Sequence, residues 1–185
     1  MLHPIDEVPA GEIRVRLALI SEQRLLESLQ LRASLNNPGD REAILANPDA
    51  IEVPAEQIVN GCVFVAEVAG SISGFVALIP REDTAGELDA LFVEPDNWRR
   101  GVGRALIEHC IQVARSHGWT SIHVIGNPHA EGFYAACGFE RVGIQQMRFG
   151  VGHLLRLVLQ EPDPSTRRTQ ASRLRPHVPD DHIKC

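Results

Sequence analysis

The chain has 185 residues, of which 44% are hydrophobic and 23% are charged, and its formal net charge is -6. This length suits one domain with a full hydrophobic core, and the composition is ordinary for a globular protein. The acidic balance argues against a protein that binds nucleic acid through a basic surface, so we expect no nucleic-acid partner.

The cysteines and histidines indicate neither disulfides nor a metal centre. Four cysteines form no Cys-x-x-Cys pair, and Cys62 and Cys110 fall in apolar patterns typical of buried free thiols. Eight histidines are scattered without metal-site spacing, so we expect no bound metal. The sequence has no signal-peptide pattern and no apolar run of membrane length, so we expect a cytoplasmic protein without a membrane partner.

The first part of the chain predicts one strand followed by helices. Residues 12–19 alternate between apolar and polar side chains, as a half-buried strand does. Ser21 is a suitable N-cap for an amphipathic helix that ends before an Asn-Asn-Pro-Gly break. Asp40 can cap a short second helix over residues 41–46, and Pro54 can begin one more helical turn.

Strand patterns dominate the middle and the end of the chain. Residues 62–68 and 72–79 predict a hairpin, and residues 88–93 predict a third, central strand. A helix then leads to a strand over residues 120–125, and such a strand-helix-strand unit requires a parallel crossover. Two more strand-like runs are residues 142–149 and 153–159. We therefore predict an α/β sheet of mixed direction.

The turn after the central strand is basic and rich in glycine. Arg99, Arg100 and Arg104 surround Gly101 and Gly103, two residues that readily adopt positive φ. Such a loop points several backbone N–H groups into one concavity at the positive end of the next helix. We interpret it as a phosphate or pyrophosphate site, and an ordinary turn with solvated arginines is the alternative. It matches neither a Walker loop nor the dinucleotide fingerprint.

A second compact stretch follows the strand that ends at Ile125. A helix of about two turns carries Phe133 and Tyr134, and Gly138 ends it. Taken alone, these aromatic residues could simply pack a short helix onto the sheet.

Together the two stretches resemble the GCN5-related N-acetyltransferase (GNAT) superfamily. Leu-Phe-Val-Glu-Pro, followed by Arg-Arg-Gly-Val-Gly-Arg-Ala-Leu, is similar to its acetyl-CoA motif Arg/Gln-x-x-Gly-x-Gly/Ala. Asn-Pro-His-Ala-Glu-Gly-Phe-Tyr-Ala-Ala-Cys-Gly-Phe is similar to its Asn-x-x-Ala-x-x-Phe-Tyr-x-x-x-Gly-Phe segment. The resemblance covers roughly residues 61–159. One position departs from it, since the first Arg/Gln of the motif falls on Trp98.

The resemblance implies an α/β (α+β) fold with a GNAT-like mixed, mostly antiparallel central sheet. We expect six to seven strands flanked by about four helices, with the sheet splayed at its central strands. Residues 1–160 would form a single N-acetyltransferase domain. Residues 161–185 are rich in Pro, Asp, Arg, Thr and Ser, so we interpret them as a disordered or loosely packed C-terminal tail.

The implied activity is an acyltransferase reaction in a ternary complex. It would move the acetyl group of acetyl-CoA, a co-substrate, to a primary amine of a small molecule or peptide. A catalytically silent acyl-CoA-binding or sensing module is one alternative, and an unrelated phosphate-binding protein is another. Residues 25–60 and the last strands would select the acceptor, but neither carries a readable motif. A homodimer paired through residues 153–159 is a further possibility.

The resemblance also assigns roles to individual residues. The backbone of Phe92 and Val93 and the side chain of Asn127 would bind pantetheine, and amides of residues 99–104 would bind the pyrophosphate. Tyr134 would protonate the departing sulfur, since a phenol with a pKa near ~10 is protonated at neutral pH. The expected cofactor-binding residues are Leu91, Phe92, Val93, Arg99, Arg100, Gly101, Val102, Gly103, Arg104, Ala105, Asn127 and Phe133.

The base that deprotonates the amine stays open at this point. Glu87 and Asp89 share one face of the central strand, because side chains repeat every two residues, and Glu87 is the preferred candidate. An unperturbed carboxylate is a poor base for an ammonium ion, so it would act through burial or a water relay. His129 is a further candidate beside the expected sulfur site. Both carboxylates could instead be solvated charges at the start of a strand.

Overall fold

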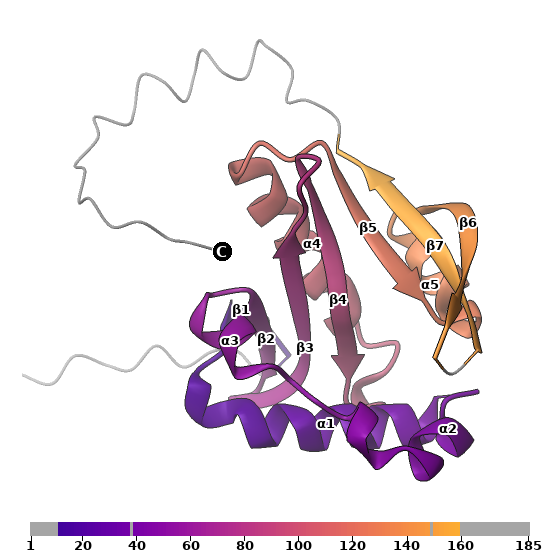
Figure 1. The fold of residues 1–185 in the computed structure, drawn as a ribbon. Helices are drawn as coiled ribbons and strands as arrows, with labels where there is room; N and C mark the ends of the chain where they lie inside the picture. Colours follow the sequence, from indigo (N-terminus) through magenta and orange to yellow (C-terminus); the bar gives the residue numbers. More distant parts are fainter. Residues whose placement is uncertain (1–10, 38, 149, 160–185) are drawn as a thin grey trace, which may run out of the picture.

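The computed structural model describes residues 11–37, 39–148 and 150–159. Their strands form one seven-stranded sheet (Figure 1). In order across the sheet, the strands are β1 (Ile13–Leu17), β2 (Val63–Val68), β3 (Ser71–Pro80), β4 (Ala85–Val93), β5 (Ser121–Gly126), β7 (Gly150–Val158) and β6 (Glu140–Met147). The pair β4 and β5 is parallel, and the other neighbouring pairs are antiparallel. The predicted mixed, mostly antiparallel sheet is therefore confirmed.

Within the described residues, five α-helices accompany the sheet, where about four were expected. They are α1 (Gln23–Asn36), α2 (Arg41–Ala46), α3 (Ala55–Val59), α4 (Val102–Ser116) and α5 (Glu131–Ala136). Short 3₁₀ turns lie between them at η1 (Ile20–Glu22), η2 (Pro48–Ala50), η3 (Pro95–Asn97) and η4 (Pro128–Ala130).

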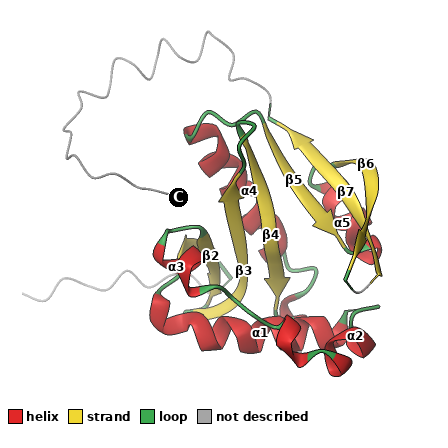
Figure 2. Ribbon diagram, viewed as in Figure 1, coloured by secondary structure: helices red, strands yellow, loops and turns green. Residues whose placement is uncertain are grey.

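The two faces of the sheet pack against different helices. Along β2, Phe64 and Ala66 join a core cluster with α4, whereas Val63 and Val65 join a second cluster with α1 and α3. This alternation follows from the two-residue period of a strand. Figure 2 shows α4 on the far face and α3 on the near face. The core thus has two layers, one on each side of the sheet.

The N-terminal capping predictions were only partly right. Ser21 does not cap the first helix, because it lies inside η1, whose N-cap is Leu19. The Glu22 carboxylate instead accepts the Leu19 N–H at 2.8 Å, which satisfies a donor at the start of the turn. Asp40 stands at the N-cap position of α2, but its side chain makes no capping hydrogen bond. Its carboxylate accepts hydrogen bonds from the side chains of Asn37 and Asn127 instead.

The predicted hairpin and buried thiols are confirmed. The hairpin β2–β3 turns at Ala69 and Gly70, whose φ angles of 49° and 78° suit a two-residue turn. Cys62 and Cys110 are buried, and neither forms a disulfide within the described residues. Burial raises the pKa of the Cys110 thiol to about 12, so this thiol stays protonated and unreactive at neutral pH.

The last two strands form a hairpin that extends the sheet beyond β5. β7 pairs with β5 on one side and with β6 on the other, so the run 153–159 does not lie at an edge. The edge strand at this end of the sheet is β6, and all of its residues except Gly143 are exposed. The expected route to a dimer through residues 153–159 is therefore wrong, and dimerisation itself stays a prediction.

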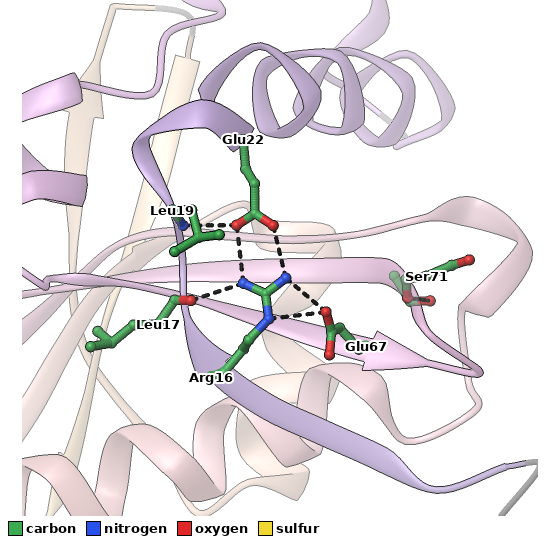
Figure 3. A network of polar contacts seen from close by, with 7 residues as sticks. Arg16, Leu17, Leu19, Glu22, Glu67 and Ser71 are labelled. Carbon is green, nitrogen blue, oxygen red and sulfur yellow. Dashed lines mark hydrogen bonds and ion pairs between the residues drawn. The ribbon is translucent and has the colours of Figure 1, made fainter. Parts of the chain in front are cut away.

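One polar cluster ties the N-terminal strand to its surroundings (Figure 3). The Arg16 guanidinium donates to both Glu22 oxygens, at 3.0 and 2.8 Å, and to one Glu67 oxygen at 2.9 and 2.7 Å. We call Arg16, Glu22 and Glu67 the Arg16 cluster. The hydrogen bonds from Arg16 lower the pKa of the Glu22 carboxyl. The cluster joins β1, η1 and β2, and its three side chains are at most 27% exposed.

Two predictions concern the ends of the chain and the membrane. The proposed tail over residues 161–185, and the first ten residues of the proposed domain, lie outside the described residues. Within the described part, no helix has the length and apolar character needed to cross a bilayer. The cytoplasmic location stays a prediction.

Candidate active site

The sheet splits between its two parallel strands. β4 and β5 pair only from Ala85 opposite Ser121 to Leu88 opposite Val124, and beyond that point they diverge (Figure 1). A cleft of about 590 Å³ lies at the split. It is lined by residues of α1 and the segment after it, the end of β4, η3 and the turn into α4, η4 and α5. These are Ala33, Ser34, Asn37, Leu91, Phe92, Val93, Asn97, Trp98, Arg99, Gly103, His129, Ala130, Phe133 and Tyr134.

A bulge in β4 directs the side chains at the split. Ala77 pairs with Ala90 and Leu78 with Leu88, so Asp89 is an extra residue without a partner on β3. After the bulge, Leu91 packs with the α4 cluster and Phe92 packs with the α1 cluster. The expected cofactor strand residues therefore line the cleft from both faces of the sheet.

The glycine turn forms an electropositive helix start. Arg99 and Gly101 have positive φ, 60° and 89°, and Gly101 is the N-cap of α4 without any side-chain cap. The first bond of the helix runs from the Ala105 N–H to the Gly101 carbonyl at 2.9 Å. The N–H groups of the first turn, including that of Gly103, have no intrahelical partner, and the helix dipole is positive there. The turn is thus suited to an anion.

The arginines and the second glycine of the turn have distinct surroundings. Arg99 lines the cleft, Arg100 is exposed, and Arg104 donates to the Ala136 carbonyl at 3.3 Å. A Cβ on Gly103 would lie 3.1 Å from the Phe133 ring, which is closer than ordinary contact. Glycine therefore lets Phe133 approach the start of α4. Val102 is buried in the core below, and Ala105 is half-buried in the helix.

Tyr134 lies between the core and the cleft. It is only 6% exposed, and its ring packs edge-on against Phe133 and Phe139, with centroids 5.2 and 5.5 Å away. Burial raises the pKa of the Tyr134 phenol, so the hydroxyl is protonated at neutral pH. Tyr134 lines the cleft, and we find no hydrogen-bond partner for its hydroxyl among residues 11–37, 39–148 and 150–159. A protonated phenol therefore lines the cleft at the split, and its role as a proton donor stays a prediction.

Asn127 does not line this cleft. Its side-chain oxygen accepts the His129 N–H at 2.9 Å, and its amide nitrogen donates to the Asp40 carboxylate at 2.7 Å. It lines a second cleft of about 440 Å³, between the loop after α1, the end of β5 and the β6–β7 turn. His129 lines both clefts.

The two candidate bases also lie outside the lining of the first cleft. Glu87 accepts a hydrogen bond from Arg81 at 3.2 Å, and Asp89 accepts one from Gln57 of α3 at 2.8 Å. Glu87 pairs in register with His123 of β5, beside the point where the strands split. Burial, followed by the charge of Arg81, lowers the pKa of His123, which keeps this imidazole neutral at neutral pH. The sequence alone does not indicate His123, because only the parallel register brings it beside Glu87.

Polar residues of α1 and of the position after it were also missed. Gln30 and Ser34 lie one turn apart on α1, and Ser34 and Asn37, the C-cap residue, line the first cleft. The Gln30 side-chain oxygen is buried without a hydrogen-bond partner within the described residues. The i, i+4 spacing of Gln30 and Ser34 can be read from the sequence, whereas the place of Asn37 depends on where the helix ends.

Among the residues that the structure describes, no group of three or more His, Cys, Asp or Glu side chains could hold a metal ion.

Comparison with known proteins places the chain in a family. Residues 31–139 match the Acetyltransferase (GNAT) family, which is more than half of the chain. The chain belongs to the GNAT family. The matched region includes the split, the glycine turn and Tyr134, and the superfamily predicted from the two motifs is confirmed.

Curated relatives in the GNAT family include N-acetyltransferase family 8 member 3 of Rattus norvegicus, 28% identical over 138 residues. That match covers 69% of this chain and 60% of the rat protein. An uncharacterized N-acetyltransferase of Methanocaldococcus jannaschii is 37% identical over 87 residues, covering 42% of this chain and 38% of that protein. The chain therefore spans less than two thirds of the length of either relative.

Solved GNAT structures share the fold. The paiA N-acetyltransferase of Thermoplasma acidophilum, in complex with coenzyme A, aligns with a TM-score of 0.63 at 15% identity, over 80% of this chain and 99% of that chain. The ribosomal-protein-S18-alanine N-acetyltransferase of Escherichia coli aligns with a TM-score of 0.61 at 19% identity, over 83% and 97%. These likenesses concern the fold.

The departure from the GNAT motif at Trp98 has a structural counterpart. The Trp98 indole N–H donates to the Val93 carbonyl at 2.8 Å, so the side chain fastens the turn to the end of β4. An Arg or Gln at this position could offer further donors to a phosphate, whereas the indole has a single N–H. We therefore expect the backbone amides and Arg99 to carry the anion contacts in this chain.

Proposed function

We propose that this chain is an N-acetyltransferase that moves the acetyl group of acetyl-CoA to a primary amine of a small molecule or peptide. Its membership of the GNAT family supports acetyl transfer in general. One observation carries the proposal further: Tyr134, the split end of β4 and the anion-binding turn all open on one cleft of about 590 Å³. The proposed acid, the proposed binding site of the thioester and the proposed phosphate site therefore line the same cleft.

The residues of the cleft suit the parts of acetyl-CoA. The amides of residues 101–104 would hold the pyrophosphate at the positive end of α4, with Arg99 adding charge. The unpaired edge of β4 at Leu91, Phe92 and Val93 would offer backbone groups to the pantetheine arm and polarise the thioester carbonyl. We leave Asn127 out of this set, because its side chain is bonded to Asp40 and to the His129 N–H.

The proposed reaction balances one proton lost and one gained. The neutral amine attacks the thioester carbon, so that a C–N bond forms and the C–S bond breaks. Tyr134 gives its proton to the departing sulfur. Its raised pKa keeps the phenol protonated until that step. A base takes the proton from the amine nitrogen. Glu87, beside His123 at the split, or His129 at the rim of the cleft, would serve directly or through a water.

A catalytically silent acyl-CoA-binding module is the second candidate. It is favoured by the bonding of the two carboxylates first considered as bases, because Glu87 is paired with Arg81 and Asp89 with Gln57. Neither carboxylate lines the first cleft. Such a module would bind acyl-CoA without turnover.

Two measurements separate these functions. Thermal denaturation with acetyl-CoA, CoA, ATP or NAD tests the cleft, since a ligand of the native state raises the midpoint. We expect a rise with acetyl-CoA and CoA only, and no rise, or an equal rise with ATP, would reject the site. Free-thiol release with an amine panel then tests turnover.

The variant Tyr134→Phe should lower kcat by about 100-fold while leaving the acetyl-CoA midpoint shift unchanged. Phe139→Leu is a matched control for the packing of the Tyr134 ring, because it alters the neighbouring side chain and leaves the phenol in place. Full turnover in Tyr134→Phe would remove Tyr134 from the mechanism, and no turnover in the unmodified chain would favour the silent module.

A further inference from the structure

A polar bridge separates the two clefts. Asp40 Oδ2 accepts from the Asn37 side-chain amide at 2.6 Å, and Asp40 Oδ1 accepts from the Asn127 side-chain amide at 2.7 Å. We call Asn37, Asp40 and Asn127 the Asp40 cluster. Asn37 lines the first cleft, Asp40 and Asn127 line the second, and His129 lines both. The Asp40 cluster therefore lies where a molecule in the second cleft would meet acetyl-CoA in the first.

Neutral groups hold the Asp40 carboxylate within this bridge. Both of its partners are neutral amides, and it forms no ion pair within residues 11–37, 39–148 and 150–159. Each carboxylate oxygen accepts up to two hydrogen bonds, so each retains capacity for another donor. Arg148 also lines the second cleft, but its guanidinium binds Asp49 at 3.1 Å.

The Asp40 carboxylate does not cap the helix that it precedes. An Asp at the N-cap commonly accepts a backbone N–H of its own helix, which stabilises the helix start. Here Asp40 precedes α2 but makes no capping bond, and the amides of Asn37 and Asn127 hold its side chain toward β5. The fold thus orients a charged acceptor toward the second cleft instead of toward α2.

We propose that Asp40 selects the acceptor by binding a second cationic group on it, distinct from the amine that is acetylated. This inference rests on the proposed function. The reacting nitrogen must be neutral when it attacks, and a carboxylate beside it would favour its charged ammonium form. Asp40 therefore serves another nitrogen of the same molecule. The substrate class is a dication, either a small diamine or a peptidyl amine beside a basic side chain.

The test compares matched acceptors on the full chain. We would measure free-thiol release at saturating acetyl-CoA with 1,5-diaminopentane and with pentylamine, which lacks the second ammonium group. A second pair would be a tripeptide amide with a blocked N-terminus and with lysine beside arginine, and the same peptide with alanine in place of arginine. The peptide pair distinguishes a peptidyl acceptor from a small diamine.

The variants remove or keep the charge of Asp40. Asp40→Asn should lower kcat/KM for the dication about tenfold or more, through KM, and leave the matched monocation unchanged. Asp40→Glu should restore part of the preference. Glu42→Gln is the matched control, because it removes one charge from an exposed carboxylate of α2 that does not line either cleft.

Two results would overturn the inference. One is an unmodified chain that does not prefer the dication, and the other is an Asp40→Asn variant that loses both acceptors equally. If acetyl-CoA raises the midpoint but no amine is acetylated, the failure lies with the proposed function. Calorimetric titration of the diamine into the CoA-bound chain then decides: binding that Asp40→Asn abolishes supports the inference, and no binding rejects it.

Discussion

Two polar clusters tie the N-terminal part of the chain to the sheet, and they balance charge differently. In the Arg16 cluster a guanidinium lies between two carboxylates, and none of its members lines either of the two clefts described above. In the Asp40 cluster a carboxylate lies between two neutral amides, and every member lines a cleft. A carboxylate that is paired with an arginine of the protein already has its counter-ion and stabilises the fold. A carboxylate held only by neutral amides can still bind the cation of a ligand.

The largest expected effect comes from removing the cation of the first cluster. Arg16→Met should lower the free energy of unfolding by about 2 kcal/mol, because Glu22 and Glu67 would be left close together, largely buried and without a counter-ion. Urea unfolding followed by circular dichroism measures this. The midpoint shift with acetyl-CoA should be unchanged.

Arg14→Met is the control for this substitution, since Arg14 is an exposed arginine of the same strand. Its effect should stay within about 0.5 kcal/mol. Equal destabilisation by the two substitutions would contradict the structural role of the Arg16 cluster. Loss of acetyl-CoA binding in Arg16→Met would break the division between the two clusters.

A smaller effect, about 1 kcal/mol at neutral pH, is expected for Glu22→Gln. The pKa of Glu22 is lower in the folded chain than in the unfolded chain, through its hydrogen bonds with Arg16. Its contribution is therefore complete above the unfolded pKa of about 4 and disappears as the pH falls through the folded pKa. Unfolding free energies of the two proteins, measured from pH 7 to pH 2, should converge at the acidic end. A difference that grows on acidification would reverse the assigned sign.

The smallest effect on stability, within about 1 kcal/mol, is expected for Asn127→Ala in the second cluster. Its functional effect should be specific: KM for the acceptor rises several-fold because Asp40 loses one of its two anchors, and KM for acetyl-CoA is unchanged. Steady-state kinetics with each substrate varied in turn distinguishes these constants. A rise confined to acetyl-CoA would instead assign Asn127 to the pantetheine arm.

Most of the fold could be predicted from the sequence, because local signals and topology agreed. The hairpin was readable from two apolar runs around Gly70, and the parallel crossover was readable from the helix between two strands. The cap at Ser21 was misjudged, because the side chain of Glu22 satisfies the Leu19 N–H instead. Arg16 fixes the Glu22 carboxylate next to the Leu19 N–H, so this contact determines the start of the turn, although Ser21 is the more common type of capping residue.

The candidate site could be predicted only where one segment contains it. The turn at Gly101 and Gly103, and the helix with Tyr134, are continuous in sequence, and the structure brings them to one cleft. The place of Asp89 depended on a bulge, which strand periodicity does not reveal. Asp40 and Asn127 are 87 positions apart, so their contact follows from tertiary structure alone.

The short parallel joint of the sheet also has a mechanical meaning. β4 and β5 share four register pairs, whereas β4 shares seven with β3 and β5 shares six with β7. Force applied across the strands, with handles attached on β2 and β7, would load these ladders in series, and we expect the four-pair joint to open first. The sheet would then separate between β4 and β5, with β1 to β4 on one side and β5 to β7 on the other, because these strands already diverge at one end.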